Sequence, residues 1–148
     1  MTYGSASGVA ALASLWTDDG EWVDPVDAYS IRGTNPSLTT VETWLVNLSS
    51  QMDTCLKSNW FNAPADETDN PVSFKSVSQY VNELAANLAR EANGADANSS
   101  SPGKTLKDMC TWVEDNADSF LGDGMTQTVT PNLKKQVRMS VIGTLPKR

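Results

Sequence analysis

Apolar residues recur at alternating spacings of four and three over three long stretches of this chain, and no other feature constrains the fold as strongly. Such a rhythm lines apolar side chains along one side of an α-helix, where they must pack against other helices. The stretches cover about residues 39–57, 74–93 and 105–121. Their apolar positions are, in chain order, Val41, Leu45, Leu48, Met52 and Cys55; Phe74, Val77, Val81, Leu84 and Leu88; and Leu106, Met109, Cys110, Val113, Ala117 and Phe120. The sequence therefore predicts a mainly α fold, an up-and-down bundle of three to four helices.

The bundle is expected to occupy only the middle of the chain. The 148 residues suffice for a single domain with a real core. We assign residues 37–122 to the bundle, residues 1–36 to an N-terminal arm and residues 123–148 to a basic C-terminal arm. Within the last arm, residues 125–142 fit a helix and a β-hairpin equally well, and the sequence leaves both open.

Local signals suggest where the helices start and stop. Ser7 can cap a short helix from Gly8 to Trp16 in the first arm. Thr39 and Glu42 have the spacing of a capping box at the start of the first long helix. Asn93-Gly94 is typical of a left-handed helix stop, and Gly122 is expected to end the third helix. The irregular rest of the N-terminal arm has three anchors that can pin it to the bundle: Trp22, Tyr29 and Ile31.

Charge is distributed unevenly along the chain. Residues 1–70 hold ten acidic side chains against Arg32 and Lys57, whereas the chain from Gly124 onward has five basic residues and no acidic one. The formal net charge of −7 argues against indiscriminate binding to nucleic acid. Opposite charges on one small chain also suit head-to-tail association of copies.

Patterns that carry catalytic chemistry are sparse. The chain has no histidine, the usual general base near neutral pH and the commonest metal ligand. It also lacks a glycine-rich phosphate-binding motif. Carboxylate pairs such as Asp18-Asp19 fall in polar loops or on outer helix faces, where they are expected to be solvated surface. We therefore expect no catalytic residue, no metal site and no cofactor, and thus a protein that is not an enzyme.

The cysteines and the N-terminus bear on the cellular compartment. Cys55 and Cys110 both fall in apolar stripes, where free thiols behave as small buried hydrophobes, so we expect both to be free. The start of the chain shows no basic segment followed by an apolar one, and no apolar run approaches the roughly 20 residues of a membrane span. We expect a protein that is neither secreted nor membrane-spanning.

Residues 15–25 read Leu-Trp-Thr-Asp-Asp-Gly-Glu-Trp-Val-Asp-Pro, with Gly33 following. This stretch resembles the opening of nuclear transport factor 2-like proteins, a family that includes ketosteroid isomerases and related small-substrate enzymes. The resemblance implies a cone-shaped α+β fold with a long curved antiparallel sheet. It also implies a pocket containing Asp18, Asp19 or Asp24, and it supplies the enzymatic alternative.

A second resemblance rests on Arg90 near the end of the second long helix, the small polar residues 95–103, and Asp115 in the third helix. The pattern is similar to coat proteins of rod-shaped, single-stranded RNA plant viruses, which are helical bundles with extended ends. In that family an arginine, a flexible loop and an aspartate in corresponding places lie at the RNA. The resemblance implies that copies assemble into a helical filament around single-stranded RNA, in a virion or the host cytoplasm.

The same resemblance suggests roles for individual residues. An arginine or lysine binds phosphate without reading the base sequence. The expected RNA-facing residues are Arg90, Lys134, Lys135 and Arg138. Asp115 and Asp118 are the expected carboxylates that repel phosphate and let a particle open. In this interpretation both arms gain their conformation from adjacent copies. The remaining interpretation is a monomeric helical adaptor whose basic tail docks an acidic partner.

Overall fold

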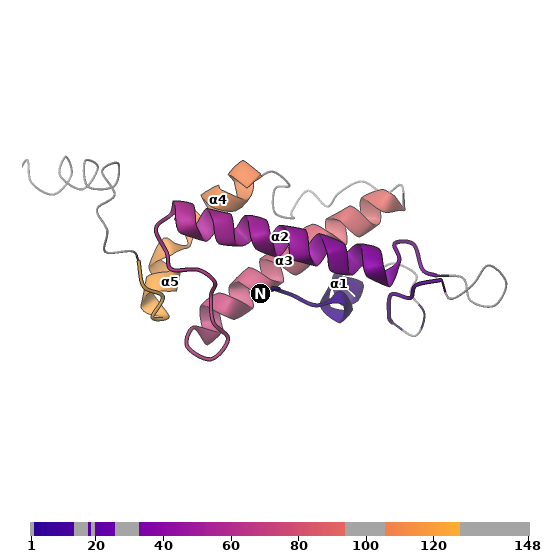
Figure 1. Cartoon of the computed structure of the whole chain (residues 1–148), viewed down its shortest axis with the longest axis horizontal. Coiled ribbons are helices and arrows are strands. Elements are labelled where there is room, and N and C mark those ends of the chain that lie inside the picture. Colours follow the sequence, from indigo (N-terminus) through magenta and orange to yellow (C-terminus); the bar gives the residue numbers. More distant parts are fainter. Residues whose placement is uncertain (1, 14–17, 19, 26–32, 94–105, 128–148) are drawn as a thin grey trace, which may run out of the picture.

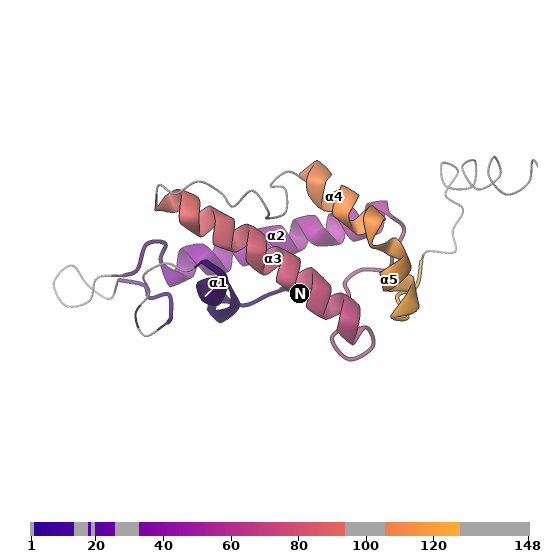
Figure 2. The ribbon, with the colours of Figure 1, turned by 180° about the vertical axis from the view of Figure 1, so that it is seen from behind.

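A computed structural model describes residues 2–13, 18, 20–25, 33–93 and 106–127, and five α-helices account for most of these residues. Figures 1 and 2 show the two longest helices crossing at the centre of the molecule, with one short helix beside them and two more toward the opposite end. Within those ranges no strand forms; only two isolated β-bridges occur, Asp18 with Glu21 and Phe61 with Gln127. The prediction of a mainly α bundle is confirmed. The helices are α1 (Ala6–Ala13), α2 (Leu38–Ser58), α3 (Pro71–Ala92), α4 (Leu106–Asp115) and α5 (Ala117–Gly122).

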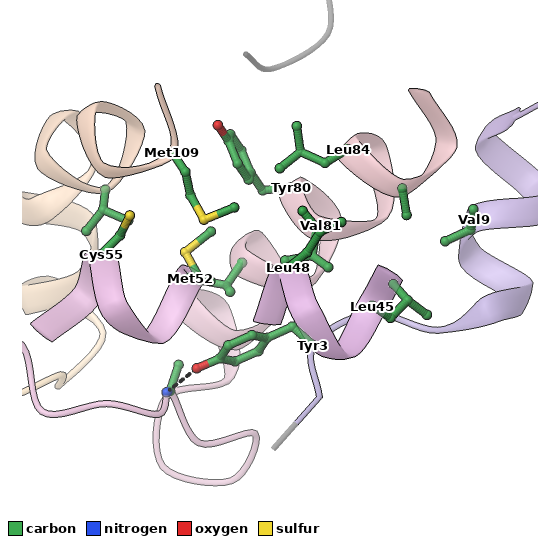
Figure 3. Packing of buried hydrophobic residues seen from close by; sticks show 14 of the residues in the cluster. Tyr3, Val9, Leu45, Leu48, Met52, Cys55, Tyr80, Val81, Leu84 and Met109 are labelled. Carbon is green, nitrogen blue, oxygen red and sulfur yellow. Dashed lines mark hydrogen bonds between the residues drawn. The ribbon is translucent and has the colours of Figure 1, made fainter. Parts of the chain in front are cut away.

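The apolar stripes predicted for α2 and α3 form the centre of the core, as Figure 3 shows. All five stripe positions of α2 are buried. In α3, Val77, Val81 and Leu84 are buried, while Phe74 and Leu88 are partly covered and pack against the core. The stripe rhythm therefore predicted both the helices and the faces that they bury.

The first turn of α2 is capped differently from the predicted pattern. Its N-cap is Ser37, whose Oγ accepts a hydrogen bond from the N–H of Thr40 at 3.3 Å. The carboxylate of Asp24 accepts the N–H of Thr39 at 2.7 Å and the hydroxyl of the same residue at 2.5 Å. A carboxylate here satisfies an unpaired helix N–H and meets the positive end of the helix dipole. The capping box of Thr39 and Glu42 is wrong, because Asp24 reaches this turn from a distant part of the chain.

Asp24 should make the stability of the fold depend on pH. The hydrogen bonds from Thr39 hold the pKa of Asp24 below its ordinary value. A carboxyl with a lowered folded-state pKa stabilises the fold above its unfolded pKa, about 4, and loses that effect as the pH falls through the folded value. We therefore expect Asp24→Asn to melt below the wild-type protein at neutral pH, with a gap that closes as the medium becomes strongly acidic. Thermal melts of the two proteins over this range test it, and a gap independent of pH would contradict it.

The N-terminal residues pack into the core of their own chain. Tyr3 is fully buried; its hydroxyl donates to Oδ1 of Asp53 at 2.6 Å and accepts the N–H of Ala65 at 2.9 Å (Figure 3). Its backbone N–H donates to Oγ of Ser49 at 2.7 Å. Burial, and then the hydrogen bond to Asp53, raise the pKa of Tyr3. Tyr3 thus ties the start of the chain to α2 and to the connection that leads into α3.

The short helix α1 is also part of the core and packs against α3 and α2. It begins earlier than predicted because Ser5, and not Ser7, accepts the N–H of Gly8, at 3.1 Å. Val9 and Ala13 of α1 are buried. Trp22 further along is buried as predicted, whereas Trp16, Tyr29 and Ile31 lie outside the described residues. The described residues of the predicted N-terminal arm therefore include a helix, α1, that packs against the bundle of its own chain.

The third predicted helix is divided into α4 and α5 at Asn116. The Asn116 side chain donates to the carbonyl of Trp112 at 2.8 Å, and its backbone N–H donates to the same carbonyl at 3.1 Å. Asparagine competes in this way with helix hydrogen bonding, which explains the break. The stripe is confirmed at Met109, Val113 and Phe120, which are buried, but Leu106 is 44% exposed and was wrongly placed in the core.

The left-handed stop expected from Asn93-Gly94 lies partly outside the described residues. Asn93 has φ −97°, ordinary right-handed backbone, and Gly94 lies outside the described residues. The amide of Asn93 instead donates to the carbonyls of Asn35 at 2.6 Å and Ala89 at 3.0 Å. The side chain thus closes the helix and holds the segment before α2 against it.

An aromatic cluster attaches α4 and α5 to the rest of the bundle. The ring of Trp112 lies 4.3 Å from that of Tyr80 on α3 and 5.8 Å from that of Phe120 on α5, between centroids. Phe120 in turn meets Phe61 edge-on at 5.5 Å. Rings at these separations contribute beyond their buried area. The cluster fixes α5 beside the start of α3.

Candidate functional site

The part of the chain that the structure describes is strongly acidic. It carries fifteen acidic side chains and four basic ones, a balance of −11, whereas residues 128–148 contain five basic residues and no acidic one. A body of this charge repels phosphate. Any contact with a polyanion must therefore come from a locally basic part of the chain.

Arg90, the described member of the predicted RNA-facing set, is engaged with the end of α1. Its guanidinium donates to the carbonyl oxygens of Leu12 and, at 3.2 Å, Ala13, and to Oδ1 of Asn87 at 2.8 Å. The carbonyls at the end of a helix lack partners within it, and a cation there meets the negative end of the helix dipole. These contacts favour a structural role for Arg90 over the predicted role in phosphate binding.

The structural role of Arg90 can be measured directly. Arg90→Met should lower the free energy of unfolding by about 1–3 kcal/mol, because the carbonyls of Leu12 and Ala13 lose their donors. Lys75→Met on the exposed side of the same helix removes an equal charge and should change that energy by no more than about 0.5 kcal/mol. Urea unfolding of both variants gives the comparison, and equal losses would show that Arg90 has no special role.

The predicted carboxylates lie in a different part of the molecule from Arg90. Asp115 ends α4 and Asp118 lies in the first turn of α5, and both are exposed. Arg90 belongs to the last turn of α3, whereas α5 packs near the first turns of that helix (Figures 1 and 2). The structure therefore does not assemble the arginine–aspartate pair that the coat-protein resemblance implies. Lys134, Lys135 and Arg138 lie outside the described residues.

The start of α3 and the end of α5 meet in a site that the sequence did not predict. Asp123 joins them: its Oδ2 accepts the N–H of Ser73 at 2.7 Å, and its carbonyl accepts the amide of Asn70 at 3.2 Å. Two apolar side chains on these segments stay in solvent, Val72 at 61% and Leu121 at 44% exposure. We call this surface the α3–α5 end and define it by five exposed residues: Glu67, Asp69, Val72, Asp118 and Leu121.

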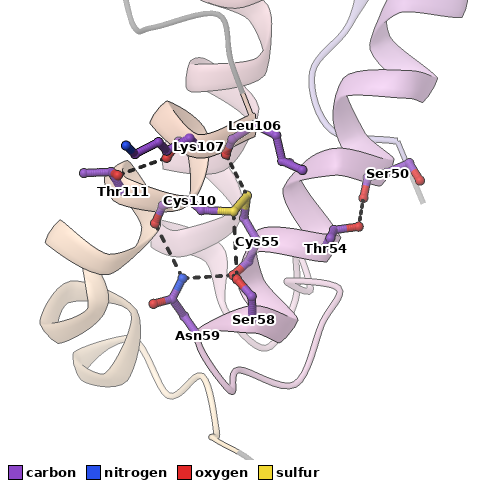
Figure 4. Close-up of a disulfide and its surroundings, with 9 residues drawn as sticks. All are labelled: Ser50, Thr54, Cys55, Ser58, Asn59, Leu106, Lys107, Cys110 and Thr111. Carbon is purple, nitrogen blue, oxygen red and sulfur yellow. Dashed lines mark hydrogen bonds between the residues drawn. A yellow bond between two sulfur atoms is a disulfide. The ribbon is translucent and has the colours of Figure 1, made fainter. Parts of the chain in front are cut away.

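A disulfide between Cys55 and Cys110 links α2 to α4, so the prediction of two free thiols is wrong (Figure 4). Both cysteines do face the interior; Cys55 is fully buried and Cys110 is partly covered. The pairing becomes possible because α4 packs on the second half of α2, which brings the two Cα atoms to 4.7 Å. Asn59 reinforces the junction, since its amide donates to the carbonyls of Cys55 at 3.0 Å and Cys110 at 3.5 Å.

In the acidic loop before α3, the side chain of Asp66 stabilises the local backbone. Oδ1 of Asp66 accepts the N–H groups of Thr68 at 2.7 Å and Asp69 at 2.9 Å, a turn made by its own side chain. Among the described residues, no group of three or more acidic, histidine or cysteine side chains is arranged to hold a metal ion. No helix in the same ranges is long and apolar enough to cross a membrane.

Comparison with known proteins gives no relative: no family model, no curated protein and no solved structure matches this chain.

Proposed function

We propose that this chain is a self-assembling structural protein, the coat subunit of a helical filament that packages single-stranded RNA. The observation that carries the proposal is the contrast between the acidic helical body, at −11, and the basic residues 128–148. A polyanion is repelled by the first and attracted by the second. Such a chain can bind RNA along one edge while its body builds the wall of a particle.

The RNA-facing set in this proposal is smaller than the sequence suggested. Lys134, Lys135 and Arg138 lie within five residues of one another and have no acidic neighbour in that segment. Arg90 is omitted, because its donors are directed at the end of α1. Asp115 and Asp118 keep their proposed role as exposed carboxylates that repel phosphate and let a particle open.

The disulfide supports a particle that leaves the cell. Structural disulfides persist in oxidising surroundings, which include the surfaces of virions, and are rare in proteins that stay in a reducing cytosol. The bond between Cys55 and Cys110 therefore suits a coat subunit better than a cytosolic adaptor.

The enzymatic alternative receives little support from the ordered residues. A nuclear transport factor 2-like fold needs a long curved sheet, and residues 106–127, where much of it would lie, form α4, α5 and one bridged residue. Asp24, a candidate pocket residue in that alternative, caps α2.

Imaging of purified protein with single-stranded RNA tests the proposal. We expect rods in negative stain when RNA is added at low salt, and fewer rods as salt rises. Lys134→Gln, Lys135→Gln and Arg138→Gln combined should abolish them. The matched control combines Lys57→Gln, Lys75→Gln and Lys107→Gln, an equal charge change on exposed body lysines, and should assemble normally. A single monomer peak in sizing under every condition would contradict the proposal and favour a monomeric adaptor.

A further inference from the structure

The α3–α5 end leaves apolar surface uncovered on an otherwise polar exterior. Val72 and Leu121 are two of only four large apolar side chains that the described residues expose. They stand on segments that two hydrogen bonds from Asn70 and Ser73 to Asp123 hold next to each other. Apolar side chains grouped in this way on a small protein commonly mark a contact with another molecule.

The two segments that carry these apolar side chains are rich in carboxylates. Residues 66–75 and 115–124, which form this region, contain six acidic residues and one basic residue, Lys75. Glu67, Asp69 and Asp118 are exposed. A ligand that fits must therefore offer apolar groups together with positive charge.

The last ten residues of the sequence have that composition. Residues 139–148 read Met-Ser-Val-Ile-Gly-Thr-Leu-Pro-Lys-Arg, four large apolar residues followed by two cations and no acid. They are separate from the cluster at 134–138 that the proposed function assigns to RNA. The chain enters this C-terminal region beside the same end of the bundle, where the N–H of Asn62 donates to the carbonyl of Thr126 at 2.8 Å.

We infer that the α3–α5 end of one copy binds residues 139–148 of a second copy. The apolar residues of that segment cover Val72 and Leu121, and Lys147 and Arg148 face Glu67, Asp69 and Asp118. The contact joins two different surfaces, so it is heterologous, and each copy can bind a further one at its other surface. Such repetition generates an open filament when the rotation between successive copies does not close into a ring. The inference rests on the self-assembly in the proposed function and gives it a specific contact.

Charge reversal on each side of the contact tests the inference in full-length protein without RNA. The end variant combines Glu67→Lys, Asp69→Lys and Asp118→Lys, and the tail variant combines Lys147→Glu and Arg148→Glu. Sedimentation velocity should show concentration-dependent association of the wild-type protein, weakened about tenfold in Kd by either variant. Mixing the two variants should restore association, because the reversed end then faces a reversed tail.

A matched control separates the contact from general charge effects. Asp18→Lys, Glu21→Lys and Glu42→Lys combined make an equal change at exposed positions away from this surface and should leave association intact. A milder variant, Glu67→Gln with Asp69→Asn and Asp118→Asn, guards against misfolding, with circular dichroism as the check. Neutralising carboxylates on an acidic protein ordinarily promotes association, so a decrease here would identify a specific contact.

The outcomes distinguish this contact from the proposed function. A wild-type protein that stays monomeric at all concentrations without RNA, or a mixture of variants that fails to associate, would overturn the contact. Normal RNA-dependent rods from the end variant would also overturn it, while leaving the proposed function in place. If the wild-type protein associates without RNA as expected but forms no rods when RNA is added, the contact is supported and the coat role is rejected.

Discussion

Replacing Cys55 and Cys110 with alanine is expected to lower the free energy of unfolding by about 4 kcal/mol, the chain-entropy value for a loop closed by cysteines 55 positions apart. The bond restricts the unfolded chain, and its loss lets that chain gain entropy while the helices keep their contacts. Guanidinium unfolding of the double variant against the oxidised wild-type protein measures the difference. A loss of this size is a large share of the stability of a domain this small.

A reductant supplies the control for this prediction. It should lower the unfolding midpoint of the wild-type protein to near that of the double variant and leave the variant unchanged. Thiol titration of the unfolded, non-reduced wild-type protein should find no free thiol. Two titratable thiols, or a variant as stable as the wild-type protein, would contradict the pairing.

Truncating Phe120 to alanine should cost about 3–5 kcal/mol, the usual range for deleting a buried aromatic ring. Phe120 is 1% exposed and its ring lies against those of Phe61 and Trp112. Its removal would leave a cavity between α5, α4 and the loop before α3, and would loosen the end of the bundle that bears the α3–α5 surface. Urea unfolding and the near-ultraviolet circular dichroism of the tryptophans would report both effects.

The adjacent residue offers a matched control. Leu121→Ala removes a smaller apolar side chain from the same helix, and Leu121 is 44% exposed. Its effect should stay within about 0.5 kcal/mol, the range of ordinary surface substitutions. If the two variants lose equal stability, α5 is not packed as described.

Apolar periodicity predicted the properties that a single helix determines by itself, namely its extent and its buried face. The stripe from Val41 to Cys55 identified both the extent of α2 and its buried face, because a helix repeats with a fixed period. The same logic worked for α3. It failed at Leu106 and at the break after Asp115, where the Asn116 side chain competes for helix hydrogen bonds.

Features that depend on two distant segments could not be predicted in this way. Periodicity placed Cys55 and Cys110 on inner faces but does not give the register of α4 along α2, which decides whether the sulfur atoms meet. Arg90 looked available for phosphate until α1 was found to end beside it. The N-cap of α2, Ser37, is a local signal, but Asp24, which also accepts an N–H of this turn, lies 15 positions before Thr39, and local capping rules consider only neighbours in sequence.

The candidate site could not be predicted either, because it is formed by two segments that are distant in the sequence. Val72 and Leu121 are about fifty positions apart, and their segments are brought together by the hydrogen bonds from Asn70 and Ser73 to Asp123. In the sequence, Leu121 lies at the end of the third predicted helix and Val72 lies before the start of the second, so nothing links them. The basic C-terminal segment, in contrast, could be identified from the sequence, because its excess of basic residues is a property of consecutive residues and does not depend on contacts with another segment.

The link between Cys55 and Cys110 turns the intervening chain into a closed ring that contains all of α3. A protease that cuts once anywhere inside this ring, for instance within residues 94–105, leaves a molecule that is still one covalent piece. A nicked protein would therefore run at its full mass in a non-reducing gel and separate into two fragments only after the sulfur bridge is broken.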